Sequence, residues 1–199
     1  FIYDSDKTKY TKCDKTCKYC TAKEFGKCES KECNTNYLPL EDKLTYCKEK
    51  SPGKYYDTNT SQGYFISDTD ETIYTKCDKS CKSCTGTEYG KCEVNGCNID
   101  YIPLEDKLTY CYSKTPEKYY HSDTSQGYFI SDSDKTKYSK CDKSCKICTG
   151  TEFGKCEAKE CNSNTSFNPL EDNMTYCVKK DKIGYYNTEL KQGYFNSVD

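Results

Sequence analysis

The chain has 199 residues and a formal net charge of −2, because 30 lysines and no arginine oppose 32 acidic residues. The lysines are scattered among Asp and Glu, which argues against a nucleic-acid-binding surface, since such a surface gathers its positive charge on one face. With a mean hydropathy of −1.03 and no apolar run near about 18 residues, the sequence predicts no membrane span, and no stretch resembles a signal peptide.

Few aliphatic residues are available for a core. Hydrophobic residues form 34% of the chain, but the sequence has 18 Cys, 21 Tyr and 7 Phe, which account for most of them. An ordinary apolar core is therefore not expected. Small modules of this kind depend on disulfides to offset the entropy lost on folding.

The cysteines fall into three sets of six. Each cysteine of the second set lies 64 residues after its counterpart in the first, and the third set keeps this offset until its last member, which comes two residues late. A fixed period of this length indicates copies of one structural unit. The sets are Cys13, Cys17, Cys20, Cys28, Cys33 and Cys47; Cys77, Cys81, Cys84, Cys92, Cys97 and Cys111; Cys141, Cys145, Cys148, Cys156, Cys161 and Cys177.

The period divides the chain into three repeats. Repeat 1 covers 1–64 with its cysteine module at 13–47, repeat 2 covers 65–128 with its module at 77–111, and repeat 3 covers 129–194 with its module at 141–177. Residues 195–199 begin a further repeat, because Phe195 aligns with Phe1. Both ends thus fall at the same point of the period, and we expect the chain to be an excerpt of a longer array.

In chain order, repeat 2 predicts two short hairpins separated by cysteine-rich loops. The stretches 65–68 and 72–77 favour strands on either side of an Asp-rich turn. A loop segment with glycines at 86, 90 and 96 follows. The stretches 101–104 and 107–111 then flank Glu105-Asp106 and predict a second hairpin.

A cysteine-free spacer of 29 residues separates each cysteine module from the next, as between Cys111 and Cys141. Aromatic side chains recur there, and they bury large areas with preferred stacking geometries. We expect these aromatics to carry the contact between successive modules. They are Tyr55, Tyr56, Tyr64, Phe65, Tyr74, Tyr119, Tyr120, Tyr128, Phe129 and Tyr138.

Six cysteines per module allow three disulfides each, in any of 15 pairings. A native disulfide contributes about 2 to 4 kcal/mol, mostly by restricting the unfolded chain. Disulfides at this density persist only in an oxidising compartment. The sequence therefore predicts an extracellular or cell-surface protein.

The spacing C-x3-C-x2-C-x7-C-x4-C, seen from Cys77 to Cys97 and in its two copies, resembles the furin-like repeats of growth-factor-receptor cysteine-rich regions. It also resembles tandem cysteine-rich surface proteins of protists, including the ciliate immobilisation antigens. The resemblance covers about half of each repeat, and the long spacers depart from it. It implies that the first cysteine pairs with the third, the second with the fourth and the fifth with the sixth. In repeat 1 these pairs are Cys13 with Cys20, Cys17 with Cys28, and Cys33 with Cys47.

The sequence favours no enzyme and no cofactor. A zinc site of four thiolates is an alternative use of the cysteines, but zinc sites usually combine Cys-x2-Cys pairs or add histidines, and this chain has one histidine. Pairs such as Cys81 and Cys84 have the spacing of redox enzymes, yet no helical pattern follows them. The single His121 aligns with Asp57 and Asn187 and is expected in an exposed loop, so no repeated catalytic triad is present.

Two acidic motifs recur with the period. Asp-x-Asp turns at 4–6, 68–70 and 132–134 offer alternate carboxylates to calcium, although turn chemistry explains them equally well. The Leu-Glu-Asp triplets that begin at Leu40, Leu104 and Leu170 are expected to form hairpin tips and no binding site.

Three N-glycosylation sequons begin at Asn59, Asn164 and Asn173. Asn164 lies in or beside the two-residue insertion of repeat 3, where a glycan is easily accommodated.

Together these features predict small disulfide-rich tandem repeats of short β-hairpins and loops, with little helix, in an elongated, rod-like array. The expected function is structural: a glycosylated extracellular filament or surface coat, whose partners are further repeats of the chain, neighbouring copies and covalent glycans. The alternative is a receptor or adhesin ectodomain that binds a protein or glycan, and a secreted protease inhibitor is favoured less.

Overall fold

The computed structural model describes residues 10–180, 184–188 and 191–195. Within these residues the fold is a disulfide-rich assembly of short β-strands with two single-turn 3₁₀ helices and no α-helix, as the sequence predicts. The chain divides into two compact units, residues 1–101 with 108–111 and residues 102–107 with 112–199.

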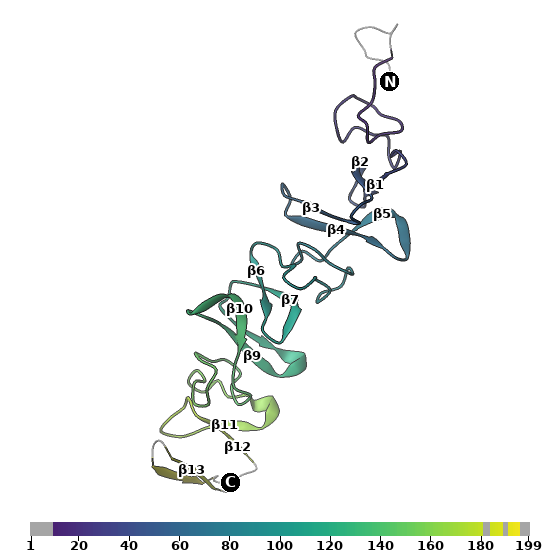
Figure 1. Cartoon of the computed structure of the whole chain (residues 1–199). Helices are drawn as coiled ribbons and strands as arrows, with labels where there is room; N and C mark the ends of the chain where they lie inside the picture. Colours follow the sequence, from purple (N-terminus) through teal and green to yellow (C-terminus); the bar gives the residue numbers. More distant parts are fainter. Residues whose placement is uncertain (1–9, 181–183, 189–190, 196–199) are drawn as a thin grey trace. The chain divides into compact units, whose positions relative to one another are not determined.

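The first unit holds a five-stranded sheet in the order β2-β1-β5-β4-β3 (Figure 1). All neighbours are antiparallel except β1 and β5, which are parallel and pair Leu40 with Tyr74. The hairpin β1–β2 belongs to the cysteine module, whereas β3, β4 and β5 come from the spacer. The strands are β1 (Tyr37–Leu40), β2 (Lys43–Glu49), β3 (Lys54–Asp57), β4 (Gln62–Ser67) and β5 (Asp70–Lys76).

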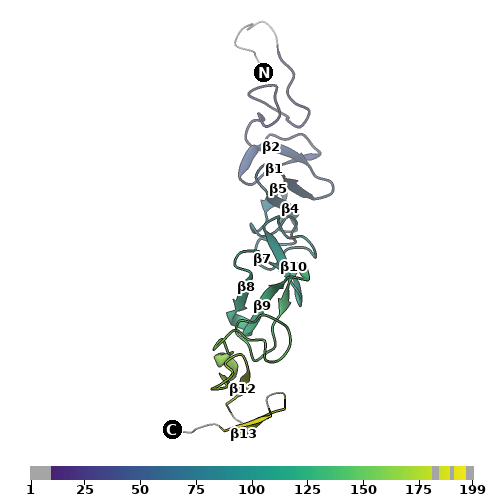
Figure 2. The ribbon, with the colours of Figure 1, turned by 90° about the vertical axis from the view of Figure 1, so that its left-hand side faces the viewer.

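The same order, β7-β6-β10-β9-β8, recurs one period later. Figure 2 shows β8, β9 and β10 side by side in this sheet. Tyr138 in β10 pairs in parallel with Leu104 in β6. The strands are β6 (Tyr101–Leu104), β7 (Lys107–Ser113), β8 (Lys118–His121), β9 (Gln126–Ser131) and β10 (Asp134–Lys140), with the 3₁₀ turn η1 (Ser122–Thr124) between β8 and β9.

The last four described strands pair differently. They form two separate two-stranded sheets, β11–β12 and β13–β14. The 3₁₀ turn η2 (Ser163–Thr165) lies at the two-residue insertion of repeat 3, just before β11. The strands are β11 (Phe167–Pro169), β12 (Cys177–Lys179), β13 (Gly184–Asn187) and β14 (Gln192–Phe195).

The two hairpins that the sequence predicts in repeat 2 are present: the predicted strands 65–68 and 72–77 correspond to β4 and β5, and 101–104 and 107–111 correspond to β6 and β7. The sequence does not predict β3 and β8, the first strands of these two spacers. Phe65, where we place the start of repeat 2, lies inside β4, so that boundary cuts through a folded hairpin.

Nine disulfides join the cysteines, with Cα–Cα distances of 5.0 to 5.8 Å. These pairs are the ones that the resemblance implies. They are Cys13–Cys20, Cys17–Cys28, Cys33–Cys47, Cys77–Cys84, Cys81–Cys92, Cys97–Cys111, Cys141–Cys148, Cys145–Cys156 and Cys161–Cys177. Disulfide density of this kind is typical of proteins from oxidising compartments.

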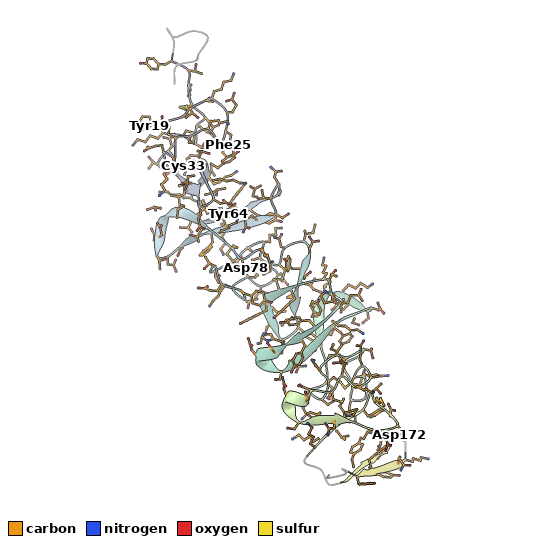
Figure 3. The ribbon with its side chains drawn as sticks, turned by 180° about the vertical axis from the view of Figure 1, so that it is seen from behind. Tyr19, Phe25, Cys33, Tyr64, Asp78 and Asp172 are labelled. Atoms are coloured by element: carbon orange, nitrogen blue, oxygen red, sulfur yellow. A yellow bond between two sulfur atoms is a disulfide. The ribbon has the colours of Figure 1, made fainter. Side chains whose placement is uncertain are left out.

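The segment from the first to the fifth cysteine, here called the cysteine-loop segment, is irregular and starts from a side-chain turn. Asp78, labelled in Figure 3, accepts hydrogen bonds from the backbone N–H of Ser80 at 2.9 Å and from its hydroxyl at 2.5 Å. Asp142 and Ser144 repeat this arrangement. An aspartate turn of this type reverses the chain between the first and second cysteines.

Sulfur supplies much of the core. Three buried clusters consist mainly of cystines, one for each cysteine module, and the second and third also contain a buried phenylalanine of the preceding spacer, Phe65 or Phe129. A fourth cluster is free of sulfur and contains Leu38, Leu40, Tyr64 and Tyr74. Disulfides and tyrosines thus replace the aliphatic side chains that the composition lacks.

The prediction that His121 lies in an exposed loop is wrong. His121 ends β8 and is only 8% exposed, with its ring near those of Tyr112 and Tyr119. Its counterparts Asp57 and Asn187 are also buried. The position is therefore a buried end of a spacer strand. The sequence does not predict its burial, because three different polar residues occupy it.

Candidate functional site

The feature that recurs most closely is the junction through which a spacer contacts the cysteine modules before and after it. Adjacent residues of a strand point to opposite faces of its sheet. Accordingly, Tyr64 of β4 packs with Leu38 and Leu40 of the preceding hairpin, whereas Phe65 packs among the cystines of the following module. One strand thus contacts two modules.

The Leu-Glu-Asp triplet anchors the spacer to the preceding hairpin. Tyr64 donates its hydroxyl hydrogen to Asp42 Oδ1 at 2.9 Å, and Lys76 Nζ lies 3.2 Å from Asp42 Oδ2. Glu41 Oε2 accepts a hydrogen bond from the Lys76 backbone N–H at 2.9 Å, and the Glu41 N–H donates to the Tyr74 carbonyl at 3.0 Å. The two acidic residues of the hairpin tip therefore hold both β4 and β5.

The second unit repeats this anchor. Tyr128 donates to Asp106 Oδ1 at 2.9 Å, and Lys140 Nζ lies 2.9 Å from Asp106 Oδ2. Glu105 Oε2 accepts from the Lys140 N–H at 3.0 Å, and the Glu105 N–H donates to Tyr138 at 2.9 Å. The expectation that the triplets form hairpin tips is met, but they are also contact sites, because their carboxylates face tyrosines and lysines of the spacer.

Burial and hydrogen bonding shift the ionisation of this anchor. Burial, followed by the hydrogen bond to the Asp42 carboxylate, raises the pKa of Tyr64 well above its usual range. Burial opposes ionisation of Asp42, yet the hydrogen bonds from Tyr64 and Lys76 together lower its pKa. Burial likewise raises the pKa of Tyr138 to about 12. At neutral pH the anchor is a neutral phenol bonded to a carboxylate, the stronger class of hydrogen bond.

On its other face the backbone of the spacer packs directly against the backbone of the following cysteine-loop segment. A Cβ placed on Gly63 would overlap the carbonyl oxygen of Lys82, and a Cβ on Gly127 would overlap that of Lys146. Only glycine has no side chain to obstruct this contact. The Gly of the recurring Gly-Tyr-Phe is therefore required by the neighbouring module.

Polar side chains complete this contact. Tyr56 donates to Asn98 Oδ1 at 2.7 Å, and Asn98 Nδ2 donates to the Ser61 carbonyl at 2.5 Å. Lys54 of β3 also forms an ion pair with Glu93. In the second unit the matching pairs are Tyr120 with Asn162 at 3.1 Å, Asn162 with Ser125 at 2.5 Å, and Lys118 with Glu157.

The predicted packing aromatics divide into three groups. Tyr64, Tyr74, Tyr128 and Tyr138 are at most 1% exposed and lie against the preceding hairpin. Phe65, Phe129, Tyr56 and Tyr120 contact the following module. Tyr55 and Tyr119 lie in the same sheets as Tyr64 and Tyr128 and pack against their rings, with centroids 5.9 and 6.4 Å apart.

Sequence reasoning missed several contact residues, namely Asp42, Glu41, Lys76, Gly63 and Asn98. One signal was available. The Asp of Leu-Glu-Asp, the Tyr of Gly-Tyr-Phe and the Lys before the first cysteine recur at the same period, although nothing in a single sequence says that residues 22 positions apart touch.

The Asp-x-Asp turns are explained by local hydrogen bonds. Asp70 Oδ1 accepts from the Thr72 N–H at 2.9 Å and from its hydroxyl at 2.5 Å, and Asp134 does the same with Thr136. These are the turn interactions that aspartate commonly makes. The turn at 4–6 lies outside the described residues, and the described residues contain no group of three or more His, Cys, Asp or Glu placed to hold a metal ion.

The three sequons differ in their surroundings. Asn59 is exposed in the turn between β3 and β4. Asn164 is exposed in η2, but its Nδ2 donates to the Tyr120 hydroxyl at 3.1 Å. Asn173 is half-buried, and its Oδ1 accepts from Thr175 at 2.8 Å. Asn59 is therefore the most accessible of the three sequon asparagines.

Across residues 10–180, 184–188 and 191–195, no helix has the length and apolar character that a membrane crossing requires. Comparisons of the chain with protein-family models, curated proteins and solved structures find no match.

Proposed function

We propose that this chain is a structural repeat protein of an extracellular filament or cell-surface coat. The observation that supports this best is the near identity of its two described junctions. Tyr64 with Asp42 and Tyr128 with Asp106 have the same 2.9 Å distance. Identical neighbour contacts at each step are what a linear assembly requires, since each repeat then adds to the next by one rule.

The chemistry of the junctions suits a structural role. Each spacer is held to the preceding module by a parallel strand pair and a tyrosine–carboxylate hydrogen bond, and to the following module by packed backbone. Each module is crosslinked by three disulfides, which resist unfolding in the oxidising conditions outside a cell. The resemblance to tandem surface proteins of protists agrees with this proposal.

Glycosylation belongs to the same proposal. Asn59 lies in an exposed turn, as a glycan acceptor must. Glycans on a coat or filament would cover its polar surface and limit lateral association.

Immunogold electron microscopy on the source material tests the proposal. Antibodies raised against the folded chain, and a control serum depleted on the same chain, would be applied to intact cells and to the material they release. Gold particles along regular fibres or in a continuous surface layer are the expected result. Labelling of isolated particles bound to a second protein would support the receptor alternative, and labelling confined to the cell interior would overturn the proposal.

A further inference from the structure

Two tyrosines touch where the edge strands of the second sheet come together. Tyr112 lies in β7 and Tyr119 in β8, and the strand order places these strands at opposite edges of the sheet. The two ring centroids are 3.8 Å apart with an interplanar angle of 40°, and the Tyr119 hydroxyl donates to the Tyr112 hydroxyl at 2.5 Å. By comparison, the stacked rings of Tyr119 and Tyr128 have centroids 6.4 Å apart. The two phenols are therefore in direct contact.

The surroundings hold this pair in place. The His121 ring lies edge-on to both tyrosines, with centroids 6.3 Å from Tyr112 and 6.1 Å from Tyr119. The Tyr138 hydroxyl lies 2.7 and 2.5 Å from two carbonyls of the connection 113–116 between β7 and β8. Both tyrosines of the pair are half-buried. Their neighbours thus restrict the rings, while part of the pair still reaches solvent.

The fold does not depend on this pair. Tyr55 of repeat 1 corresponds to Tyr119, but the position of Tyr112 is occupied by Lys48 in repeat 1 and by Val178 in repeat 3. Lys48 Nζ lies 4.2 Å from the centroid of the Tyr55 ring, which is a cation–π contact. Repeat 1 thus builds the same five-stranded sheet without a second phenol.

We propose that Tyr112 and Tyr119 form a site of oxidative crosslinking, at which a peroxidase with hydrogen peroxide joins the two side chains as dityrosine. Each phenol loses one electron and one proton and becomes a phenoxyl radical. Hydrogen peroxide takes up both electrons and both protons and gives two molecules of water. The radicals combine through a new bond between one Cε atom of each ring. The hydrogens on these two carbons then move to the oxygens, which restores both phenols.

The contact meets the geometric needs of this coupling. In a phenoxyl radical the unpaired electron is shared between the oxygen and the ring carbons beside it, so the new bond forms next to each hydroxyl. The contact between the hydroxyls of Tyr112 and Tyr119 brings these parts of the rings together. Partners held in this way react as if at very high concentration. Coupling within the pair is therefore favoured over coupling between molecules.

The ionisation of the pair agrees with this chemistry. Burial, followed by the hydrogen bond to Tyr112, raises the pKa of Tyr119 well above its usual range. At neutral pH Tyr119 is therefore a phenol, and its oxidation releases a proton together with the electron.

The crosslink joins the hairpin to the spacer by a carbon–carbon bond. Reducing agents cleave disulfides but leave this bond intact, so β7 and β8 stay joined when Cys97–Cys111 is reduced. The inference goes beyond the proposed function, because it concerns a reaction within one chain and requires no assembly.

Peroxidase and hydrogen peroxide added to the purified, disulfide-bonded chain in dilute solution test the inference. Dityrosine fluorescence should appear in the monomer. After reduction and trypsin digestion, peptide 108–114 should be joined to peptide 119–135 with the loss of two hydrogen atoms. Tyr112→Phe keeps the ring but lacks the hydroxyl, and it should lower the monomer fluorescence about tenfold. Tyr110→Phe, in the same strand, is the matched control and should leave the fluorescence unchanged.

Two results of this experiment would overturn the inference. The first is equal monomer fluorescence from the wild-type chain and the Tyr112→Phe variant. The second is dityrosine found only in dimers and larger species, because that product arises when exposed tyrosines of different molecules meet. Tyr19, which is 54% exposed, is one such tyrosine.

Repeat 1 allows a gain-of-function test in the same chain. Tyr55 already occupies the place of Tyr119, and Lys48 lies over its ring. Lys48→Tyr, added to the Tyr112→Phe variant, should therefore restore the monomer fluorescence through a link between positions 48 and 55. If the fluorescence stays at the level of Tyr112→Phe alone, ring placement does not select the coupled pair and the inference fails.

The chain purified from its source, with no peroxidase added, shows whether the site is used. Its digest should contain the joined peptides 108–114 and 119–135, detected by mass spectrometry. A digest that contains these two peptides only in their unlinked form would overturn the inference and leave the proposed structural function standing.

Discussion

Tyr64 and Asp42 are 22 residues apart in the chain, yet the phenol donates a 2.9 Å hydrogen bond to the carboxylate and so ties the spacer to the hairpin before it. The pair recurs as Tyr128 with Asp106 and as Tyr194 with Asp172. In the first two cases a lysine of the spacer pairs with the same carboxylate. The hydrogen bond between this tyrosine and this aspartate is therefore present in all three copies of the repeat.

Replacing Tyr64 with Phe should destabilise the first unit by about 1 to 2 kcal/mol, because a hydrogen bond to a charged group is lost inside a buried cluster. Urea unfolding followed by circular dichroism measures the change. Tyr194→Phe is the matched control, since Tyr194 is only half-buried and its variant should lose less. If both variants lost the same free energy of unfolding, burial in the five-stranded sheet would not strengthen the tyrosine–carboxylate hydrogen bond.

Gly63→Ala should cost about 1 to 3 kcal/mol, because the added methyl overlaps the Lys82 carbonyl and the two segments must separate. Gly193→Ala, at the equivalent position after the third cysteine module, should be nearly neutral, because the added Cβ would meet only the Tyr186 ring, at 4.0 Å. Thermal melts of both variants at low concentration make the comparison. A neutral Gly63→Ala variant would mean that the spacer and the cysteine-loop segment are not in contact.

Acid should weaken the anchor between Asp42 and the spacer. The hydrogen bonds from Tyr64 and Lys76 outweigh burial and lower the pKa of Asp42, so its contribution is complete above the unfolded pKa of about 3.9 and is lost as the pH falls through the folded pKa. The melting temperature should therefore change little between pH 7 and 5 and fall below about pH 4. Asp42→Asn should flatten this fall, and an unchanged pH profile in that variant would exclude Asp42 as a source.

Asn59 should carry a glycan when the chain is secreted by a host that performs N-glycosylation. Its side chain lies in an exposed turn, whereas Asn173 is half-buried and Asn164 donates to Tyr120. Enzymatic deglycosylation in heavy-oxygen water, followed by peptide mass spectrometry, measures occupancy at each site. Asn59→Gln should remove the largest share of glycan mass, and higher occupancy at Asn173 than at Asn59 would contradict this ranking.

The sequence predicts the disulfide-rich modules and both hairpins because their signals are local or strictly periodic. The cysteine spacing sets the period, and alternating β-formers flank short turns at 41–42 and 105–106. It does not predict β3 and β8, since four residues such as Lys54–Asp57 are too short to show a pattern of their own.

The contact residues escape prediction for a different reason. Asp42 and Lys76 are charged and recur in polar surroundings, so each alone is typical of a solvated surface residue. Only the parallel pairing of β1 with β5 brings them together, and that pairing joins segments 34 residues apart. The burial of His121 escapes the sequence because the sheet around a strand end, and not the side chain itself, decides whether that end is buried.

Native-state hydrogen exchange tests most directly whether the spacers join successive modules in fixed contact. The amides of Glu41, Lys76 and Cys77, which donate across the first junction, should exchange as slowly as those of Cys81 and Asn98 inside the second cysteine module. The same equality should hold for Glu105, Lys140 and Cys141 against Cys145 and Asn162. Fast exchange at the junction amides beside protected module amides would show modules linked by loose spacers, and would contradict the account.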